Sequence, residues 1–172
     1  MKKSILITLL LCVLSVVNVT AQKFAFIDTE YILNKIPEYK SNQDKIDKQA
    51  QNYQLEVKKI TEEVQNMYQD FQEKSKSMND NQKEKQQEII MNKEKEAMEL
   101  GRKYFGPEGA IADMKSKLLD PFFDKIYEAA KIIALKYDYA AIIDRATASS
   151  IIFAKPQYDI SNEILATMGY SK

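Results

Sequence analysis

The sequence predicts an α+β fold that is mainly α-helical, with a long antiparallel helical hairpin of coiled-coil type on a small body of β-strands. Three observations predict it. Apolar residues recur at alternating spacings of four and three between Ile46 and Phe71, which is the heptad pattern of a helix that packs on a second helix. Glycine and proline are scarce, with four of each in 172 residues. Short apolar runs of strand character occur at residues 24–27, 139–143 and 150–154.

Residues 1–21 have the composition of a secretory signal peptide. Lys2 and Lys3 precede an apolar run, and the run closes on small residues, so we expect cleavage after Ala21. The run is shorter than a typical membrane-spanning helix. We therefore expect an exported chain, residues 22–172, with no integral membrane span after cleavage.

The composition of the expected mature chain argues against catalysis and against nucleic-acid binding. The single cysteine, Cys12, lies in the signal peptide, and the chain has no histidine. The groups that usually serve as nucleophile, general base or soft-metal ligand are therefore missing. The net charge after cleavage is about −2, without the basic excess that nucleic acid attracts. We predict no catalytic residue, no metal, no cofactor and no nucleic-acid partner.

Residues 22–37 are expected to form the first segment of the body. A strand at residues 24–27 is followed by a short helix with Asp28 or Thr29 as its N-cap. Pro37 suits the first turn of the next helix, because a residue at that position has no use for its backbone N–H.

Residues 38–120 are expected to form the arm. Its tip is predicted near residues 79–88, where no apolar residue occurs. The returning helix carries apolar doublets every seven residues, at Ile90-Met91, Ala97-Met98, Tyr104-Phe105, Ile111-Ala112 and Leu118-Leu119. Positions between the doublets, such as Glu94 and Gly101, are not apolar. One member of each doublet therefore faces the outgoing helix, and the other faces elsewhere.

Residues 121–172 are expected to complete the body. The first part reads as a root helix that is apolar around much of its circumference and is buried on more than one side. We expect a β-hairpin between residues 139–143 and 150–154. A short C-terminal helix follows, with Asp159 or Ser161 at its start.

One segment of the arm breaks the helical pattern. Gly106, Pro107 and Gly109 interrupt the returning helix, because proline removes a backbone donor and glycine weakens the helical turn. The phase of the doublets nevertheless continues across the interruption. We interpret this segment as a hinge that lets the arm widen; a local kink without a function is the alternative.

The predicted strands are apolar on both faces. Successive residues of a strand point to opposite faces, and one chain of this length has too few elements to cover both. We expect a homo-oligomer in which the strands pack together; the alternative is a monomer with an exposed apolar side. The residues expected to build this oligomer body are Phe24, Phe26, Ile142, Ile143, Ile151, Ile152 and Phe153.

Both ends of the chain resemble a known family. The opening segment reads KFAFIDTEYIL, and the C-terminal block contains LLDPFFDKI, YAAIID and YDISNEIL. With the signal peptide and the long charged arm, they closely resemble the OmpH-like (Skp) family of periplasmic chaperones for outer-membrane proteins. The resemblance covers nearly all of residues 22–172. It implies a periplasmic homotrimer in which three arms on a β-barrel-like body enclose a cavity that holds unfolded outer-membrane proteins without ATP.

The arm departs from the family pattern in its charge. Basic arms in this family are associated with contact to lipopolysaccharide and acidic clients. Here the lysines of the arm alternate with glutamates, as is typical of a solvated helix face. We therefore assign no lipopolysaccharide site to any residue.

A holdase of this kind needs apolar side chains that face the cavity. Many weak contacts along an arm add up to tight capture without a fixed pose, and methionine suits contact with varied partners. The candidates are the apolar residues outside the heptad seam, namely Leu55, Tyr68, Met91, Met98, Leu100 and Phe105. For each of them, ordinary packing inside the hairpin or a tolerated surface position is the alternative.

A second function remains open from the sequence. A periplasmic coiled-coil adaptor or spacer that binds one folded partner has the same heptads. Such a protein would bind its partner and ignore unfolded chains, whereas a holdase would bind many unfolded chains.

Overall fold

The computed structural model describes residues 22–170; the signal peptide expected at residues 1–21 lies outside the described residues. The chain is mainly helical with one small sheet, as the sequence predicted. In order, its elements are β1 (Lys23–Ile27), α2 (Thr29–Asn34), α3 (Pro37–Lys74), η1 (Ser75–Ser77), α4 (Asp80–Phe105), α5 (Ala110–Tyr137), β2 (Tyr139–Asp144), η2 (Pro156–Tyr158) and α6 (Ser161–Thr167).

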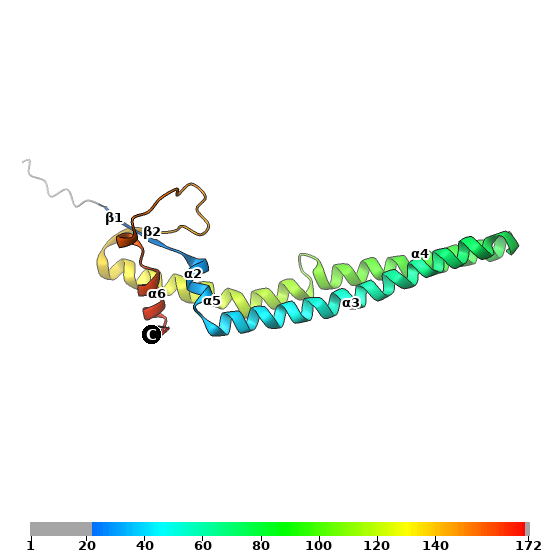
Figure 1. Cartoon of the computed structure of the whole chain (residues 1–172), viewed down its shortest axis with the longest axis horizontal. Helices are drawn as coiled ribbons and strands as arrows, with labels where there is room; N and C mark the ends of the chain where they lie inside the picture. The colour runs from blue at the N-terminus through cyan, green and yellow to red at the C-terminus, as the bar shows by residue number, and fades with distance from the viewer. Residues whose placement is uncertain (1–21, 171–172) are drawn as a thin grey trace, which may run out of the picture.

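The molecule consists of a long arm and a small body at one end of it (Figure 1). Helix α3 runs outward from the body, α4 returns beside it, and α5 leads back into the body, where β1, β2, α2 and α6 gather. We call residues 38–120 the arm and the other described residues the body. The border between them falls inside α5, which runs through Pro121 without interruption.

Local signals start the first two helices where the sequence predicted. Asp28 is the N-cap of α2, and its side chain accepts a hydrogen bond of 2.8 Å from the backbone N–H of Tyr31. Pro37 occupies the first turn of α3, after the extended residue Ile36.

The two long helices pack through the heptad seam. Ile46 and Val64 of α3 are buried, as is Ile90 of α4. Nearer the body, Tyr53 of α3 stacks on Tyr104 of α4, with ring centroids 3.8 Å apart and 9° between the ring planes. Most other seam residues are half-buried, because two helices alone cover only one stripe of each other.

The chain reverses at residues 75–79, earlier than the predicted tip at residues 79–88. Asn79 starts α4 with a capping box: its side chain accepts from the backbone N–H of Gln82, and the Gln82 side chain accepts from the backbone N–H of Asn79. The polar residues that follow have good helix propensity, so the absence of apolar residues marks a solvated helix and not a turn.

The sheet has two parallel strands, and the predicted β-hairpin was wrong. β2 pairs with β1, in register from Phe24 with Ala141 to Ile27 with Asp144. Residues 150–155 form no strand. The prediction rested on the tendency of segments close in sequence to pair. Instead, the chain between β1 and β2 passes through the whole arm and brings these two strands together in parallel.

A turn follows β2 where the predicted hairpin would also have turned. The Asp144 side chain accepts hydrogen bonds from the backbone N–H of Ala146 at 3.1 Å and from the hydroxyl of Thr147 at 3.0 Å. The backbone N–H of Ala148 then donates to the Asp144 carbonyl at 3.1 Å. These bonds hold residues 144–148 in a turn, and the chain after it forms no strand.

The core of the body lies between α5 and the elements from both ends of the chain. Ile126 and Ile133 of α5 are buried with Ala25 of β1, Ile32 of α2 and Ile164 of α6. At the root of the arm, the ring of Tyr39 meets that of Phe122 edge to face, with centroids 5.5 Å apart. The body therefore closes only when α5 has returned along the arm.

Candidate functional site

Five of the six expected lining residues are exposed on the arm. Leu55 and Tyr68 lie on α3, and Met91, Met98 and Phe105 lie on α4. Leu100, the sixth, is half-buried. The sequence did not single out Ile89, whose side chain is also exposed.

Three of these residues form one stripe along α4. Met91, Met98 and Phe105 are seven residues apart, so they share a helix face over about 21 Å. Met91 is 64 % exposed and Met98 is 66 % exposed. Leu100 follows Met98 by two residues and therefore lies on roughly the opposite side of α4. We call Met91, Met98 and Phe105 the apolar stripe.

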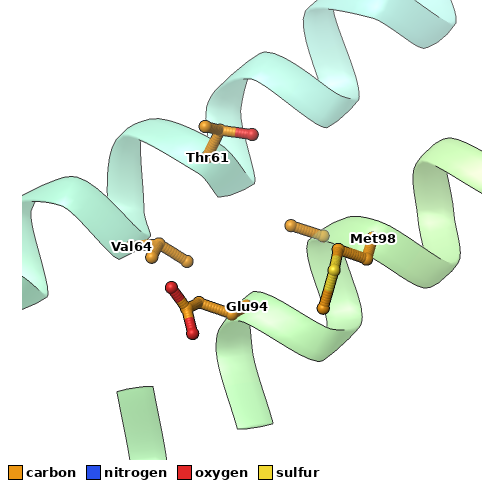
Figure 2. Close-up of a pocket in the computed structure, with 5 residues that line it drawn as sticks. Thr61, Val64, Glu94 and Met98 are labelled. Carbon is orange, nitrogen blue, oxygen red and sulfur yellow. The ribbon is translucent and has the colours of Figure 1, made fainter. Parts of the chain in front are cut away.

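A hollow of about 360 Å³ opens between α3 and α4 next to this stripe (Figure 2). Its residues are Thr61 and Val64 of α3 with Glu94, Ala97 and Met98 of α4. Figure 2 shows the labelled side chains from the two helices on opposite sides of it. We call this hollow the notch. Of its residues, only Met98 is among those predicted from the sequence to contact clients.

The notch exists because α4 carries small residues where it faces α3. Ala97 lies in the wall, and a methyl group placed on Gly101, one turn along, would meet nothing within 4 Å. The larger seam residues Ile90 and Tyr104 lie on either side of this stretch. The signal was in the sequence: the positions halfway between the apolar doublets are Glu94 and Gly101, which cannot fill a seam.

Two tyrosine–glutamate hydrogen bonds join the helices on either side of the notch. Tyr68 of α3 donates to Glu94 at 3.0 Å, and Tyr104 of α4 donates to Glu56 at 2.6 Å. In both pairs the hydrogen bond to the carboxylate, followed by burial, raises the pKa of the phenol above its usual value. The phenols therefore stay protonated donors, and the two bonds run in opposite directions between the helices.

The carboxylate of Glu94 has no cationic partner within the described chain. Among residues 22–170, no lysine or arginine nitrogen lies within 4 Å of it, and its only side-chain donor is Tyr68. The neighbouring Lys93 is instead engaged by Glu63 of α3 at 3.3 Å and by Glu96 at 3.0 Å. Glu94 thus places a negative charge at the edge of an apolar notch.

The segment expected to be a hinge is a short loop between α4 and α5. The backbone N–H of Gly106 donates to Arg102 at 2.8 Å, and that of Gly109 donates to the Gly106 carbonyl at 2.9 Å. A methyl group on Gly106 would clash with the carbonyl oxygen of Arg102, and one on Gly109 would lie 2.9 Å from the Tyr104 oxygen. The loop shape therefore requires both glycines; Pro107 between them is exposed.

The expected oligomer body is incompletely covered. In the sheet, Ala25 and Ile27 are buried on one face, whereas Phe24 on the other face is exposed. Phe26, Ile142, Ile143 and Ile151 are half-buried. Ile152 is 98 % exposed and Phe153 is 76 % exposed.

An apolar hollow lies between α5 and the sheet. It measures about 440 Å³, and its lining includes Phe123, Tyr127 and Ala130 of α5 with Ile142 of β2. Ile27 of β1 and Asp144 of β2 also line it, so the hollow lies between α5 and both strands. Within residues 22–170, β2 pairs only with β1, and its other edge has no partner strand.

A polar cluster that sequence reasoning missed joins β2 to both ends of the body. The guanidinium of Arg145 lies 3.3 Å from the carboxylate of Asp28 and 3.1 Å from that of Asp159. The backbone N–H of Asp28 donates to the hydroxyl of Ser161, which donates in turn to Asp159. From the sequence, Asp28, Asp159 and Ser161 were predicted only as residues at helix starts. Their contact with Arg145 could not be predicted, because only the fold brings them together.

Asp144 belongs to the same region. Partial burial works against its charged form, but hydrogen bonds from Thr29, Ala146 and Thr147 outweigh it and hold the pKa of Asp144 below its usual value. The cluster ties β1, β2 and the start of α6 together, and its role is structural.

Two further features of residues 22–170 bear on function. None of the helices there combines the length and the apolar character that a membrane crossing needs. No group of three or more acidic or cysteine side chains in that part of the chain is arranged to hold a metal ion.

Comparison with known proteins identifies one family. The family model described as outer membrane protein (OmpH-like) matches residues 23–168. A crystal structure of an OmpH-like protein from Caulobacter crescentus CB15, a candidate outer-membrane chaperone, is similar in fold, with a TM-score of 0.62 and 12 % sequence identity. The similarity covers 87 % of this chain and 85 % of that one. No curated protein matches the chain.

Proposed function

The chain belongs to the OmpH-like family, a family of outer-membrane chaperones, and we propose that it is an ATP-independent periplasmic holdase for unfolded outer-membrane proteins. The observation that carries this proposal is the apolar stripe of Met91, Met98 and Phe105, exposed on an arm whose surface is mostly polar and charged. The three side chains share one face of α4 at intervals of seven residues, so an extended client can contact them in turn.

The stripe suits weak and varied contact. Methionine is unbranched and polarizable, so Met91 and Met98 adapt to many partner side chains. Unfolded barrel proteins offer many apolar strand residues, and each contact alone is weak. Several contacts on several arms add up to tight capture without a fixed pose.

We propose that the arms act together in a homotrimer. Support comes from the body: within residues 22–170 one edge of β2 has no partner strand, an apolar hollow opens between α5 and the sheet, and Ile152 and Phe153 are exposed. A second copy that covers these residues would remove an apolar surface from water and occupy a strand edge that otherwise invites aggregation. Three arms on one body would then surround a common cavity.

The loop at Gly106, Pro107 and Gly109 is proposed as the hinge of each arm. Its bonds are few, and it separates the outer part of the arm, which carries the stripe, from the part anchored in the body. Movement there would let one cavity hold clients of different size.

The direct test is suppression of aggregation. An outer-membrane barrel protein is diluted from urea into buffer, with and without residues 22–172, and light scattering is followed. We expect scattering to be suppressed by the wild type and much less by a variant with Met91→Ser, Met98→Ser and Phe105→Ser. A matched variant with Gln51→Ser, Gln65→Ser and Gln87→Ser changes exposed polar residues of the arm and should retain activity. Unimpeded aggregation with the wild type would contradict the proposed function.

A further inference from the structure

We propose that the notch is a subsite for one apolar side chain of an extended client segment, and that Glu94 selects segments with a lysine or arginine two residues from that side chain. This inference rests on the proposed holdase function and adds the chemistry of the segment that is held. It concerns the hollow between Thr61, Val64, Glu94, Ala97 and Met98.

The notch has the size and the walls for an aliphatic or aromatic side chain. Its volume of about 360 Å³ exceeds that of any single apolar side chain, and Val64 and Ala97 provide apolar walls. Met98, which has the length to fold into the space, is instead 66 % exposed. The seam is therefore open at this point and its apolar wall is available to a partner.

The charge at the rim specifies the neighbour of that side chain. Glu94 is held in place by the Tyr68 hydroxyl but has no cation within 4 Å among residues 22–170, so it lacks a charge partner that a client can supply. A charge-assisted hydrogen bond to lysine or arginine is stronger than one between neutral groups. A client with an acidic residue in that position would be repelled.

The spacing of Glu94 and Met98, the two residues that bound the notch along α4, matches an extended chain. Glu94 and Met98 are one helical turn apart, which is about 6 Å along α4. Residues i and i+2 of an extended segment point to the same face and are about 6.8 Å apart. A segment that lies along α4 can therefore place an apolar side chain in the notch and a basic side chain at Glu94 together.

The competing explanation is a packing gap with no ligand. A gap of this kind costs stability, and filling it from within the protein stabilises the fold without any effect on client binding. A subsite behaves differently, because a side chain of the protein that fills it excludes the client.

The first experiment uses NMR to follow the methionine methyl signals of the protein that comprises residues 22–172. The probe is a capped threonine peptide with one phenylalanine and, two residues later, one arginine; a second peptide has glutamate in place of arginine. We expect the Met98 methyl signal to shift with the arginine peptide and far less with the glutamate peptide. Met78, at the tip, is the internal control. Equal shifts at Met78 and Met98, or none at Met98, would overturn the proposal.

The second experiment fills the notch. Ala97→Leu should weaken binding of the arginine peptide by about tenfold, which is the loss expected when a side chain is kept from partial burial. Ala50→Leu makes the same change elsewhere in the seam and should leave binding unchanged. Glu94→Gln should remove the preference for arginine over glutamate and keep the Met98 shift. Binding by Ala97→Leu equal to that of the wild type would identify the notch as a packing gap only.

The two proposals fail in distinguishable ways. If the wild type suppresses aggregation of an unfolded barrel protein but the Met98 signal does not respond to either peptide, the holdase function stands and the subsite is wrong. If the wild type does not suppress aggregation, the holdase function itself is wrong, whatever the peptides do.

Discussion

Tyr104 of α4 lies face to face with Tyr53 of α3, with ring centroids 3.8 Å apart and 9° between their planes. The Tyr104 hydroxyl also donates to Glu56 at 2.6 Å, so one side chain joins α4 to two positions of α3. This contact lies two residues before the loop at Gly106. It therefore fixes the outer part of the arm at the point where the chain leaves the helix.

Tyr104→Ala should destabilise the outer arm, because it removes the stacked ring and the hydrogen bond to Glu56. Aromatic pairs stabilise beyond their buried area, so we expect the thermal midpoint of the arm to fall by several degrees. Far-UV circular dichroism during heating measures it. Tyr104→Phe is the matched control: it keeps the stack and should melt close to the wild type. Equal losses in both variants would mean that the hydrogen bond, and not the ring stack, holds the arm.

Alanine at Gly106 should destabilise the loop, whereas alanine at Gly101 should not. A methyl group on Gly106 clashes with the Arg102 carbonyl, and we expect a loss of roughly 1–3 kcal/mol. Gly101 lies inside α4 with open space around it, so alanine there should stabilise by up to about 1 kcal/mol. Urea unfolding of both variants measures the difference. A Gly106→Ala protein as stable as the wild type would show that the loop adopts another shape.

Because of that clash, alanine substitution cannot test the hinge by stiffening it. Removal of residues 106–109 is the better variant, since it joins α4 to α5 and leaves Tyr104 and Ile111 three positions apart on one helix face. A hinge predicts that this variant binds small clients normally and large clients poorly. If the variant binds clients of every size as well as the wild type does, the loop is a kink without a role.

Ile152→Asp with Phe153→Asp should prevent assembly. Both side chains are mostly exposed in one copy, so a charge there costs the isolated chain little. In an assembly it would bury two charges without partners. Sedimentation velocity should show a trimer for the wild type and a monomer for the variant. Leu55→Asp, on the exposed face of α3, is the control that should remain a trimer; a trimer in both variants would exclude this segment from the interface.

Asp144 should make the body sensitive to acid. Its pKa in the folded protein lies below the ordinary value of 3.8, so its stabilising effect is complete above that value. The effect is lost as the pH falls from 3.8 through the folded pKa, because the folded state then binds a proton less readily than the unfolded state. The midpoint of urea unfolding should therefore fall less between pH 5 and pH 2.5 for Asp144→Asn than for the wild type. Identical pH profiles would contradict this role of the carboxylate.

Features set by neighbouring residues could be predicted from the sequence. Asp28 and Pro37 start their helices through contacts within one turn, and the heptad from Ile46 follows from the helical repeat. The partner of β2 could not be found in this way, since β1 is more than a hundred residues away and nothing local distinguishes it from residues 150–154. The cluster around Arg145 was missed for the same reason.

The candidate site was only partly predictable. Met98 was recognisable as an apolar residue outside the seam, and the small Gly101 indicated that the seam was incomplete. The pairing of Tyr68 with Glu94 depends on the rotation of α4 about its axis, and the sequence does not fix that rotation. Leu100 lies about 200° around α4 from Met98 and is half-buried, which separates it from the stripe of Met91, Met98 and Phe105.

The most direct test of the holdase function is native mass spectrometry of residues 22–172, alone and after an unfolded outer-membrane barrel protein is diluted into it from urea. We predict a trimer alone, and in the mixture a trimer that carries one unfolded client. A monomer, or a trimer that leaves the client to aggregate, would contradict the proposal and favour an adaptor with one folded partner.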